Sequence, residues 1–236
     1  MKIVTWNCCW DLGSERERDS KKAALLNLDF DIAVVPEASR PDIESFASDG
    51  FSTQWIGEDE RHGLGMLAKK PMDLTNVQKC GTLMATVDVE RNRERVFTLV
   101  AVWPVAKGYA GYTKEILNSF KNAVVWPDDQ KVIVAGDFNS NAQWNSKCPK
   151  DYKHSSIVEL LEKKNLLSAY HAKHNNGRHG DETAHTYHHL WNAEDGFHLD
   201  YIFVPKDWME RASVHLGIHQ DWLKHSDHCP LSVEIN

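Results

Sequence analysis

Polar residues that could do chemistry follow an apolar segment near the middle of the chain. Residues 131–141 read KVIVAGDFNSN, so Asp137 and Asn139 come shortly after four apolar residues and a glycine. Side chains two positions apart project from the same side of an extended chain. We therefore expect Asp137 and Asn139 to face one site rather than to cap a turn.

Four other segments place acids, amides or a histidine at the end of an apolar stretch or within one. The residues concerned are Asn7, Glu37, Asp200, Asp227 and His228. Taken singly, each is better explained as a turn residue, a cap or a core residue. Taken together they indicate a site, because buried carboxylates are costly unless they are paired or bind a cation.

The residue types favour hydrolysis of a phosphoester with the help of a divalent ion. Glu37, Asn7 and Asp227 offer hard oxygen ligands, which suit Mg²⁺ or Mn²⁺ and not zinc. Such an ion neutralises a phosphate and the charge that develops on it. Asp137 is of the right type to orient or deprotonate the attacking water.

The remaining polar residues of the set complete this chemistry. The amide of Asn139 can hold a phosphoryl oxygen without adding negative charge. His228 can donate a hydrogen bond or a proton to the phosphate, and Asp200 is expected to fix the tautomer of His228 and raise its basicity. The residues alone thus predict metal-assisted hydrolysis of a phosphoester.

A fold rich in short strands must position these residues. Helices are expected at 14–28, 40–49, 113–125 and 155–165. Short runs of β-branched and aromatic residues predict strands at 2–6, 32–36, 51–56, 64–68, 82–89, 95–103, 131–136, 199–205, 212–218 and 230–235. The surplus of strands favours an α/β fold with two packed sheets covered by helices over a doubly wound parallel sheet.

Length and composition restrict the class of protein. The chain has 236 residues and no linker-like segment, so one domain spanning residues 1–236 is expected. With a net charge of −7, any nucleic acid must be bound through a local patch or through bound cations. Five scattered cysteines are typical of a reducing compartment. Because neither a signal peptide nor a membrane span is evident, we expect a cytoplasmic protein with no membrane contact and no obligate protein partner.

The polar motifs, in their order along the chain, resemble the endonuclease/exonuclease/phosphatase superfamily. That family includes DNase I, abasic-site endonucleases of the exonuclease III type, inositol polyphosphate 5-phosphatases and sphingomyelinases. The motifs that carry the resemblance are TWN at 5–7, PE at 36–37, GDFN at 136–139, LDYIF at 199–203 and SDHCPL at 226–231. They extend over nearly the whole chain, and their combination in this order is specific.

The resemblance implies a four-layer α/β sandwich of the DNase I type, with two mixed sheets back to back and a site at one end. It also implies a phosphodiesterase or phosphatase that depends on Mg²⁺ or Mn²⁺. Glu37 would be the main metal ligand, assisted by Asn7 and Asp227. Asp137 would handle the nucleophilic water and Asn139 would contact the phosphate, while Asp200 would pair with His228.

One segment departs from the family pattern. The strand before the GDFN motif usually ends in a His or Tyr that assists the leaving group, whereas Trp103 occupies this region here. Core packing and a functional role explain Trp103 equally well. Lys107, Tyr109 and Tyr112 follow shortly after, and one of them could supply the missing donor. For Lys107 an ordinary solvated side chain is the better explanation.

The substrate is expected to be DNA. In exonuclease III-like enzymes a Thr-aromatic segment before the LDYIF motif leads into a DNA-contacting loop, and Thr186 and Tyr187 match that pattern. Tyr187 or Trp191 could stack on a base or sugar. Local lysines could supply a basic patch, although each alone is better explained as surface charge: Lys69, Lys70, Lys107, Lys147, Lys150 and Lys153.

The working hypothesis is therefore a 3′→5′ exonuclease, an abasic-site endonuclease, or both, with Asn139, Lys107, Tyr112 and Tyr187 binding substrate. A phosphatase of a small-molecule or lipid phosphate is the first alternative. A non-catalytic binding module on the same fold is the second, and the complete polar set argues against it. The run with His185, His188 and His189 is interpreted as a polar loop and not as a zinc site.

Overall fold

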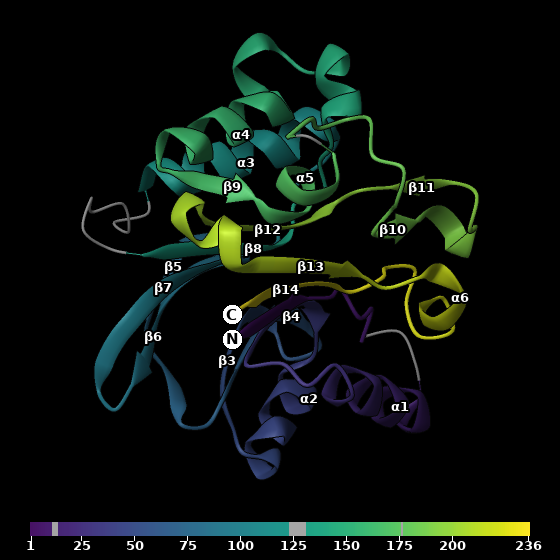
Figure 1. Cartoon of the computed structure of the whole chain (residues 1–236). Coiled ribbons are helices and arrows are strands. Elements are labelled where there is room, and N and C mark those ends of the chain that lie inside the picture. Colours follow the sequence, from purple (N-terminus) through teal and green to yellow (C-terminus); the bar gives the residue numbers. More distant parts are fainter. Residues whose placement is uncertain (11–13, 123–130, 176) are drawn as a thin grey trace.

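The computed structural model describes residues 1–10, 14–122, 131–175 and 177–236. Two six-stranded mixed sheets pack face to face, and helices cover the outer face of each (Figure 1). This four-layer arrangement confirms the predicted α/β sandwich. None of the helices in the described ranges is long and apolar enough to cross a bilayer.

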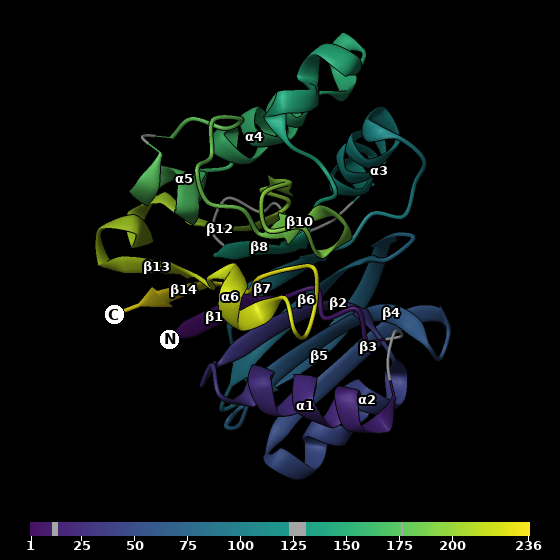
Figure 2. The same ribbon diagram turned by 90° about the vertical axis from the view of Figure 1, so that its right-hand side faces the viewer.

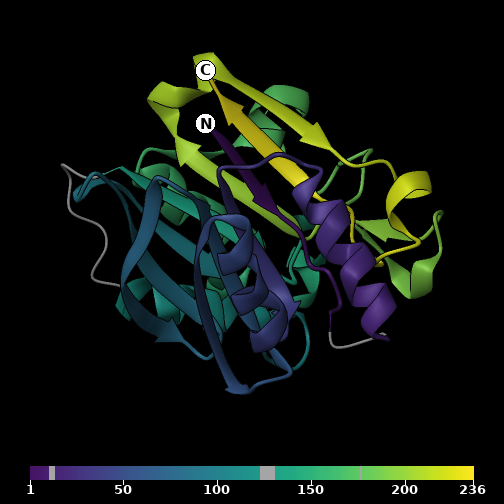
Figure 3. The same cartoon turned by 90° about the horizontal axis from the view of Figure 1, so that it is seen from below.

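The first sheet carries both ends of the chain. Its strand order is β13-β14-β1-β2-β4-β3, and β1 and β2 are parallel while the other neighbours are antiparallel. Helices α1 (Glu15–Leu26) and α2 (Arg40–Ser45) lie across its outer face (Figure 3). The strands are β1 (Lys2–Thr5), β2 (Ile32–Ala38), β3 (Phe51–Asp59), β4 (His62–Lys69), β13 (Ala212–Leu216) and β14 (Leu231–Ile235).

The second sheet has the strand order β5-β6-β7-β8-β12-β9, in which only β7 and β8 are parallel. Helices α3 (Tyr109–Asn122), α4 (His154–Lys163) and α5 (Ala169–His174) lie on its outer side (Figure 1). The strands are β5 (Met72–Gly81), β6 (Met84–Arg91), β7 (Glu94–Val102), β8 (Val132–Asp137), β9 (Leu166–Ser168) and β12 (Asp200–Pro205).

The alternation of side chains along β8 explains how the core leads to polar groups. Ile133 and Ala135 belong to the apolar cluster between the two sheets, whereas Val132 and Val134 pack in the cluster with α3 and α4. Because the side-chain period of a strand is two, Asp137 continues the series that faces the other sheet. The same holds in β12, where Ile202 and Val204 lie between the sheets and Asp200 extends their series.

Short elements gather at one end of the sandwich. Strands β10 (Tyr187–His188) and β11 (Gly196–Phe197) form a separate ribbon there, and helix α6 (His219–Trp222) lies nearby (Figure 2). The 3₁₀ segments of the chain are Phe46–Asp49, Ala142–Lys147, Lys150–Tyr152, His189–Trp191 and Lys206–Arg211.

Several elements differ from the sequence expectation. Strand β5 was not predicted, and neither were β9, α5 or α6. The helix expected at 40–49 ends at Ser45 and continues as a 3₁₀ turn. The helix expected at 113–125 begins earlier, at Tyr109, and its last three expected residues lie outside the described residues.

Candidate active site

Three buried side chains meet at the end where β8 stops and β12 begins. Asp137 and Asp200 lie opposite each other in the antiparallel pair of β8 and β12. The imidazole of His228, which precedes β14 of the other sheet, has its Nδ1 2.8 Å from Asp200 Oδ2. Ligand-type atoms of all three residues lie within 4.8 Å of one another. The sequence expectation that Asp200 pairs with His228 matches this geometry.

Burial and proximity shift the pKa values of these groups. Burial raises the pKa of Asp137, and the neighbouring Asp200 raises it further. Burial opposes the charged form of His228, but the Asp200 carboxylate outweighs it and raises the pKa of His228 to about 10. These carboxylates favour the protonated form of His228, with one N–H directed at Asp200.

The position of Asp200 is fixed by a neighbouring hydroxyl. Thr186 Oγ1 accepts hydrogen bonds from the backbone N–H groups of Leu199 and Asp200, at 2.9 and 3.0 Å. Asp200 Oδ1 is buried and has no hydrogen-bond partner within the described part of the chain. A buried carboxylate oxygen without a partner is expected to face a bound cation or a substrate donor.

The chain turns sharply on either side of Asp137. Gly136 has φ 146°, and a Cβ at this position would lie 1.9 Å from the carbonyl oxygen of Val102. Only glycine fits there. Asn139 has φ 49°, and its backbone N–H donates to Asp137 Oδ1 at 2.8 Å. Asn139 thus reaches the site through a turn, and the expectation that an extended chain presents both side chains is wrong.

Asn7 and Glu37 approach the same point from the first sheet. Asn7 Nδ2 lies 2.9 Å from Glu37 Oε1 and 3.2 Å from Asp137 Oδ2, so one amide links carboxylates of the two sheets. Glu37 has φ 55° at a bulge in the pairing of β2 with β4. A bulge of this kind re-aims a side chain, and here Glu37 lines the cleft next to Asp227 and His228.

Hydrogen bonds connect residues 226–228, which precede β14, to residues 7–9, which follow β1. Ser226 Oγ donates to the carbonyl of Asn7 at 2.7 Å and accepts from the backbone N–H of His228 at 3.0 Å. Cys9 Sγ lies 3.0 Å from Asp227 Oδ1, and burial raises the pKa of the Cys9 thiol, which keeps it protonated as a donor. These contacts hold Asp227 and His228 beside the Asn7 segment.

The donor set fits a divalent ion of the Mg²⁺ type. Glu37, Asp137, Asp200 and Asp227 bring carboxylates to one end of the core, and at least one buried oxygen lacks a partner among the described residues. Hard cations prefer such oxygen ligands. The amide oxygen of Asn7 accepts from the backbone N–H of Cys9 at 3.1 Å. In this arrangement Asn7 holds Glu37 and Asp137 in place through its NH₂ group.

A cleft of about 610 Å³ opens directly onto these polar groups, and aromatic rings form one of its sides. Tyr109 stacks on Trp144 with ring centroids 4.4 Å apart, and Phe197 lies 5.1 Å from Trp144. The described residues that line the cleft are Cys9, Glu37, Tyr109, Tyr112, Asn139, Trp144, Tyr187, His189, Trp191, Asp195, Phe197, Leu199, Asp227 and His228.

The residues expected to bind substrate are only partly brought together. Asn139, Tyr112 and Tyr187 line the cleft, and the Tyr187 ring lies 4.8 Å from that of His228. Burial raises the pKa of Tyr112, and Asp137 adds to this, so the Tyr112 hydroxyl stays protonated. Lys107 is exposed and is not among the lining residues of the cleft.

Trp103 and two of the lysines belong to other parts of the molecule. Trp103 packs in the core between the sheets, with its ring 4.8 Å from that of His62. Lys69 pairs with Asp29 at 2.7 Å, and Lys70 pairs with a nearby aspartate. Lys147, in contrast, places its ammonium 4.9 Å from the ring of Tyr109 at the cleft.

Sequence reasoning missed part of the site. The sequence motifs do not single out Trp144, Phe197 or Cys9, all of which line the cleft. A signal existed, because Trp144 follows the GDFN motif by five residues and Phe197 precedes LDYIF by two. Aromatic residues that flank both motifs were therefore candidates for the cleft wall.

Comparisons with known proteins identify the family and the fold. The model of the Endonuclease/Exonuclease/phosphatase family matches residues 4–228. No curated protein matches the chain. Among solved structures, an AP endonuclease from Archaeoglobus fulgidus superposes with a TM-score of 0.74 at 15% identity, over 100% of this chain and 99% of that one.

Two further structures come from Neisseria. The 3′-5′ exonuclease NExo from Neisseria meningitidis matches with a TM-score of 0.71 at 17% identity, over 100% of both chains. The 3′ phosphatase NExo from Neisseria, bound to a product DNA hairpin, matches with a TM-score of 0.70 at 16% identity, over 100% of this chain and 99% of that one. At these identities the likeness shows a shared fold.

Proposed function

Because the chain belongs to the endonuclease/exonuclease/phosphatase family, we propose that it is a Mg²⁺- or Mn²⁺-dependent phosphodiesterase that hydrolyses DNA. Within this class we favour a 3′→5′ exonuclease, an abasic-site endonuclease, or an enzyme with both activities. The observation that carries the proposal is the meeting of Asp137, Asp200 and His228 beside Glu37, at the polar side of a cleft lined by aromatic rings.

Asp137 is the group that handles the attacking water. One of its oxygens is held by the N–H of Asn139 and the other by Asn7, so the carboxylate has a fixed orientation. Its raised pKa makes it a better proton acceptor than an ordinary aspartate. In the proposed reaction it takes a proton from water as the oxygen of that water attacks phosphorus.

Asn139 and His228 hold the phosphate. Both line the cleft, and neither adds negative charge. His228 keeps its Nδ1 proton on Asp200, so its other N–H is available to a phosphoryl oxygen. A divalent ion held by Glu37 and Asp227 would neutralise charge on the phosphate.

The leaving oxygen needs a proton, and Tyr112 is the donor that we assign. Trp103 is a core residue and Lys107 does not line the cleft, while Tyr112 does. The hydroxyl of Tyr112 stays protonated until it gives its proton to the oxygen released when the P–O bond breaks. Of the three residues considered from the sequence, Tyr109 is the one already engaged in stacking, against Trp144.

The lining of the cleft favours DNA over a small polyphosphate. Aromatic rings offer stacking surfaces to bases and sugars. No lysine or arginine is among the described lining residues, although a site for several phosphates would need cationic groups. The structure of a family relative holding a DNA hairpin supports the same substrate class.

A panel of labelled substrates tests the proposal. The full chain is incubated with Mg²⁺ or Mn²⁺ and with duplex, nicked, single-stranded and abasic DNA, RNA, and small phosphate esters, with Asp137→Asn as the inactive control. We expect nucleotide release from 3′ ends or incision at abasic sites, lost in EDTA and in the control. Phosphate release from small esters, without turnover of any DNA, would favour the phosphatase alternative. DNA binding without turnover of any substrate would favour a binding module.

A further inference from the structure

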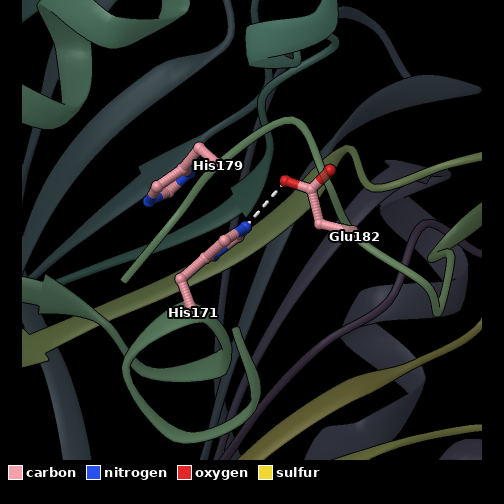
Figure 4. A group of neighbouring side chains, drawn as sticks. All are labelled: His171, His179 and Glu182. Atoms are coloured by element: carbon pink, nitrogen blue, oxygen red, sulfur yellow. Dashed lines mark hydrogen bonds and ion pairs between the residues drawn. The ribbon is translucent and has the colours of Figure 1, made fainter. Parts of the chain in front are cut away.

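A second group of ligand-type side chains lies outside the cleft. His171 comes from α5, and His179 and Glu182 come from the segment between α5 and β10; the three side chains lie together (Figure 4). Ligand-type atoms of all three lie within 4.8 Å of one another. The side chains of His171 and Glu182 are 1% and 0% exposed, whereas His179 is partly exposed. The cluster is thus buried but can be reached from solvent beside His179.

The cluster holds a buried negative charge that has no strong cation beside it. Burial opposes ionisation of Glu182, but hydrogen bonds from His171 Nε2 and the Gly180 N–H, both at 2.8 Å, and from Asn141 lower its pKa. No lysine or arginine pairs with Glu182 among the described residues. A carboxylate in this position calls for a proton on a neighbouring imidazole or for a metal ion.

The Nδ1 atoms of His171 and His179 already have side-chain hydrogen-bond partners. His171 Nδ1 lies 2.7 Å from Ser168 Oγ, and His179 Nδ1 lies 3.3 Å from His154 Nε2. His154 Nδ1 lies in turn 2.8 Å from Ser140 Oγ. Metal-binding histidines typically have the non-ligating nitrogen held in this way, because the hydrogen bond fixes the tautomer and the orientation of the ring.

A fourth imidazole nearby has an atom without a partner. His198 is fully buried, and its Nε2 has no hydrogen-bond partner in the described part of the chain. Its ring centroid lies 5.1 Å from that of His171, with the two planes nearly perpendicular. A buried nitrogen of this kind is costly to leave without a partner. It shows that the polar groups around the cluster are not all satisfied by the described residues.

We propose that His171, His179 and Glu182 bind a divalent ion of the zinc type through the two Nε2 atoms and the carboxylate, which leaves a fourth position for a water molecule. Nitrogen-rich sites with one carboxylate suit Zn²⁺, whereas Mg²⁺ and Ca²⁺ prefer oxygen ligands throughout. On binding, the single ring proton of neutral His171 resides on Nδ1 and is donated to Ser168 Oγ.

Binding requires one movement. The rings of His171 and His179 stack with centroids 3.5 Å apart and planes 7° from parallel. A nitrogen lone pair lies in the plane of its ring, so two parallel rings cannot direct lone pairs at one ion. His179 must tilt out of the stack, and its partial exposure leaves room for this.

The ion would stabilise the loop at residues 139–141, which carries Asn139 of the cleft. Asn141 Nδ2 lies 3.2 Å from Glu182 and 3.0 Å from the carbonyl of His198, and it follows Asn139 by two residues. Ser140, between them, contacts His154. A metal at this point is therefore structural, and its expected effect is on the stability of the 139–141 loop and not on the chemical step.

Zinc binding by the metal-stripped full chain tests this proposal. Zn²⁺ is titrated in competition with a chromophoric chelator and in excess Mg²⁺, and Co²⁺ is used in parallel to detect the visible absorption of a tetrahedral site. The variants are His179→Ala and Glu182→Gln, with the exposed His215→Ala as the matched control. Asp137→Asn is included because it should weaken Zn²⁺ binding only if the ion binds in the cleft and not at His171, His179 and Glu182.

We expect one tightly held Zn²⁺ per chain in the wild type, in His215→Ala and in Asp137→Asn. His179→Ala should weaken binding at least about 100-fold and abolish the Co²⁺ spectrum, with circular dichroism unchanged. The proposal is wrong if the wild type takes up no Zn²⁺ that resists Mg²⁺, or if His179→Ala binds Zn²⁺ as tightly as the wild type. It is also wrong if Asp137→Asn alone loses the ion. Because Glu182 is buried and orders a loop, His179→Ala decides the test should Glu182→Gln fail to fold.

Discussion

His228 Nδ1 and Asp200 Oδ2 lie 2.8 Å apart, although Asp200 begins β12 of the second sheet, His228 precedes β14 of the first, and the two residues are 28 positions apart in the chain. Both side chains are almost fully buried. The pair therefore fixes which way the imidazole faces, and it joins the two layers at the point where the cleft begins.

Replacing Asp200 by Asn should lower kcat by about 10²- to 10⁴-fold on the best DNA substrate, because His228 loses the partner that keeps it charged and oriented. Steady-state kinetics measure this loss. Asp207→Asn, which removes a surface acid that pairs with Lys131, serves as the control and should keep its activity. An unchanged kcat in Asp200→Asn would remove the pair from the proposed mechanism.

Asp137→Asn should lower kcat by about 10³-fold or more, since the amide cannot accept a proton from water. Its thermal stability should stay the same or rise. Burial raises the pKa of Asp137, so the folded protein disfavours the ionised carboxylate. Removing this charge offsets the loss of one of the two hydrogen bonds that the carboxylate accepts from Asn139 and Asn7. Activity and melting temperature are measured on the same preparation. Near wild-type turnover would contradict the role.

Glu37→Gln should raise the Mg²⁺ concentration needed for half-maximal activity by about tenfold or more, because it replaces a charged ligand by a neutral one. The titration of activity against Mg²⁺ measures the shift. Glu44, which lies on the surface and pairs with Arg40 at 2.7 Å, provides the control Glu44→Gln. If both variants gave the wild-type curve, Glu37 would not bind the metal.

Trp144→Ala should raise KM for DNA by about tenfold with a smaller effect on kcat, because one stacked base or sugar loses its aromatic partner. Trp144→Phe should restore most of the affinity. For a small phosphate ester the two variants should match the wild type. A loss of activity that is equal for DNA and for the small ester would show that Trp144 acts on the fold of the cleft, not on the substrate.

The histidines near Glu182 predict acid sensitivity of the metal-free protein. Burial, as the main cause, lowers the pKa of His154 and of His198 to about 3. Both groups titrate near 6.5 when unfolded, so the unfolded chain binds more protons below that pH. The free energy of unfolding is then highest above pH 6.5 and falls between about pH 6.5 and 3, by up to about 1.4 kcal/mol per pH unit for each group.

Urea unfolding in EDTA at pH 7 and pH 5 measures this fall. His198→Gln removes one of the titrating groups and should make the dependence on pH shallower, whereas the exposed His215→Gln should leave the slope unchanged. Equal stability of the wild type at the two pH values would mean that these histidines are not held neutral by the fold.

The strands and the polar ends of the strands could be predicted from the sequence because both depend on local pattern. Asp137 and Asp200 follow from the period of two, which continues the inward series of Ile133 and Ile202. Strand β5 (Met72–Gly81) could not be predicted in this way, because only one of its residues is fully buried and the others do not alternate clearly between buried and exposed.

Other parts of the site depend on backbone turns that no period reveals. Glu37 and Asn139 both have positive φ, and each is directed into the site by a bulge or a turn. The pairing of His171 with Glu182 could not be predicted, because His171, His179 and Glu182 are separated by spacings that match neither a helix nor a strand. Contacts across loops of this kind are set by tertiary packing.

The amide of Asn7 donates hydrogen bonds to Glu37 of the first sheet and to Asp137 of the second. The geometry of the reactive centre therefore depends on the relative position of the two sheets. A slip of a fraction of an ångström between the sheets would separate these carboxylates before it exposed any apolar surface. Catalytic turnover would then fade while spectroscopic signatures of the fold remained intact.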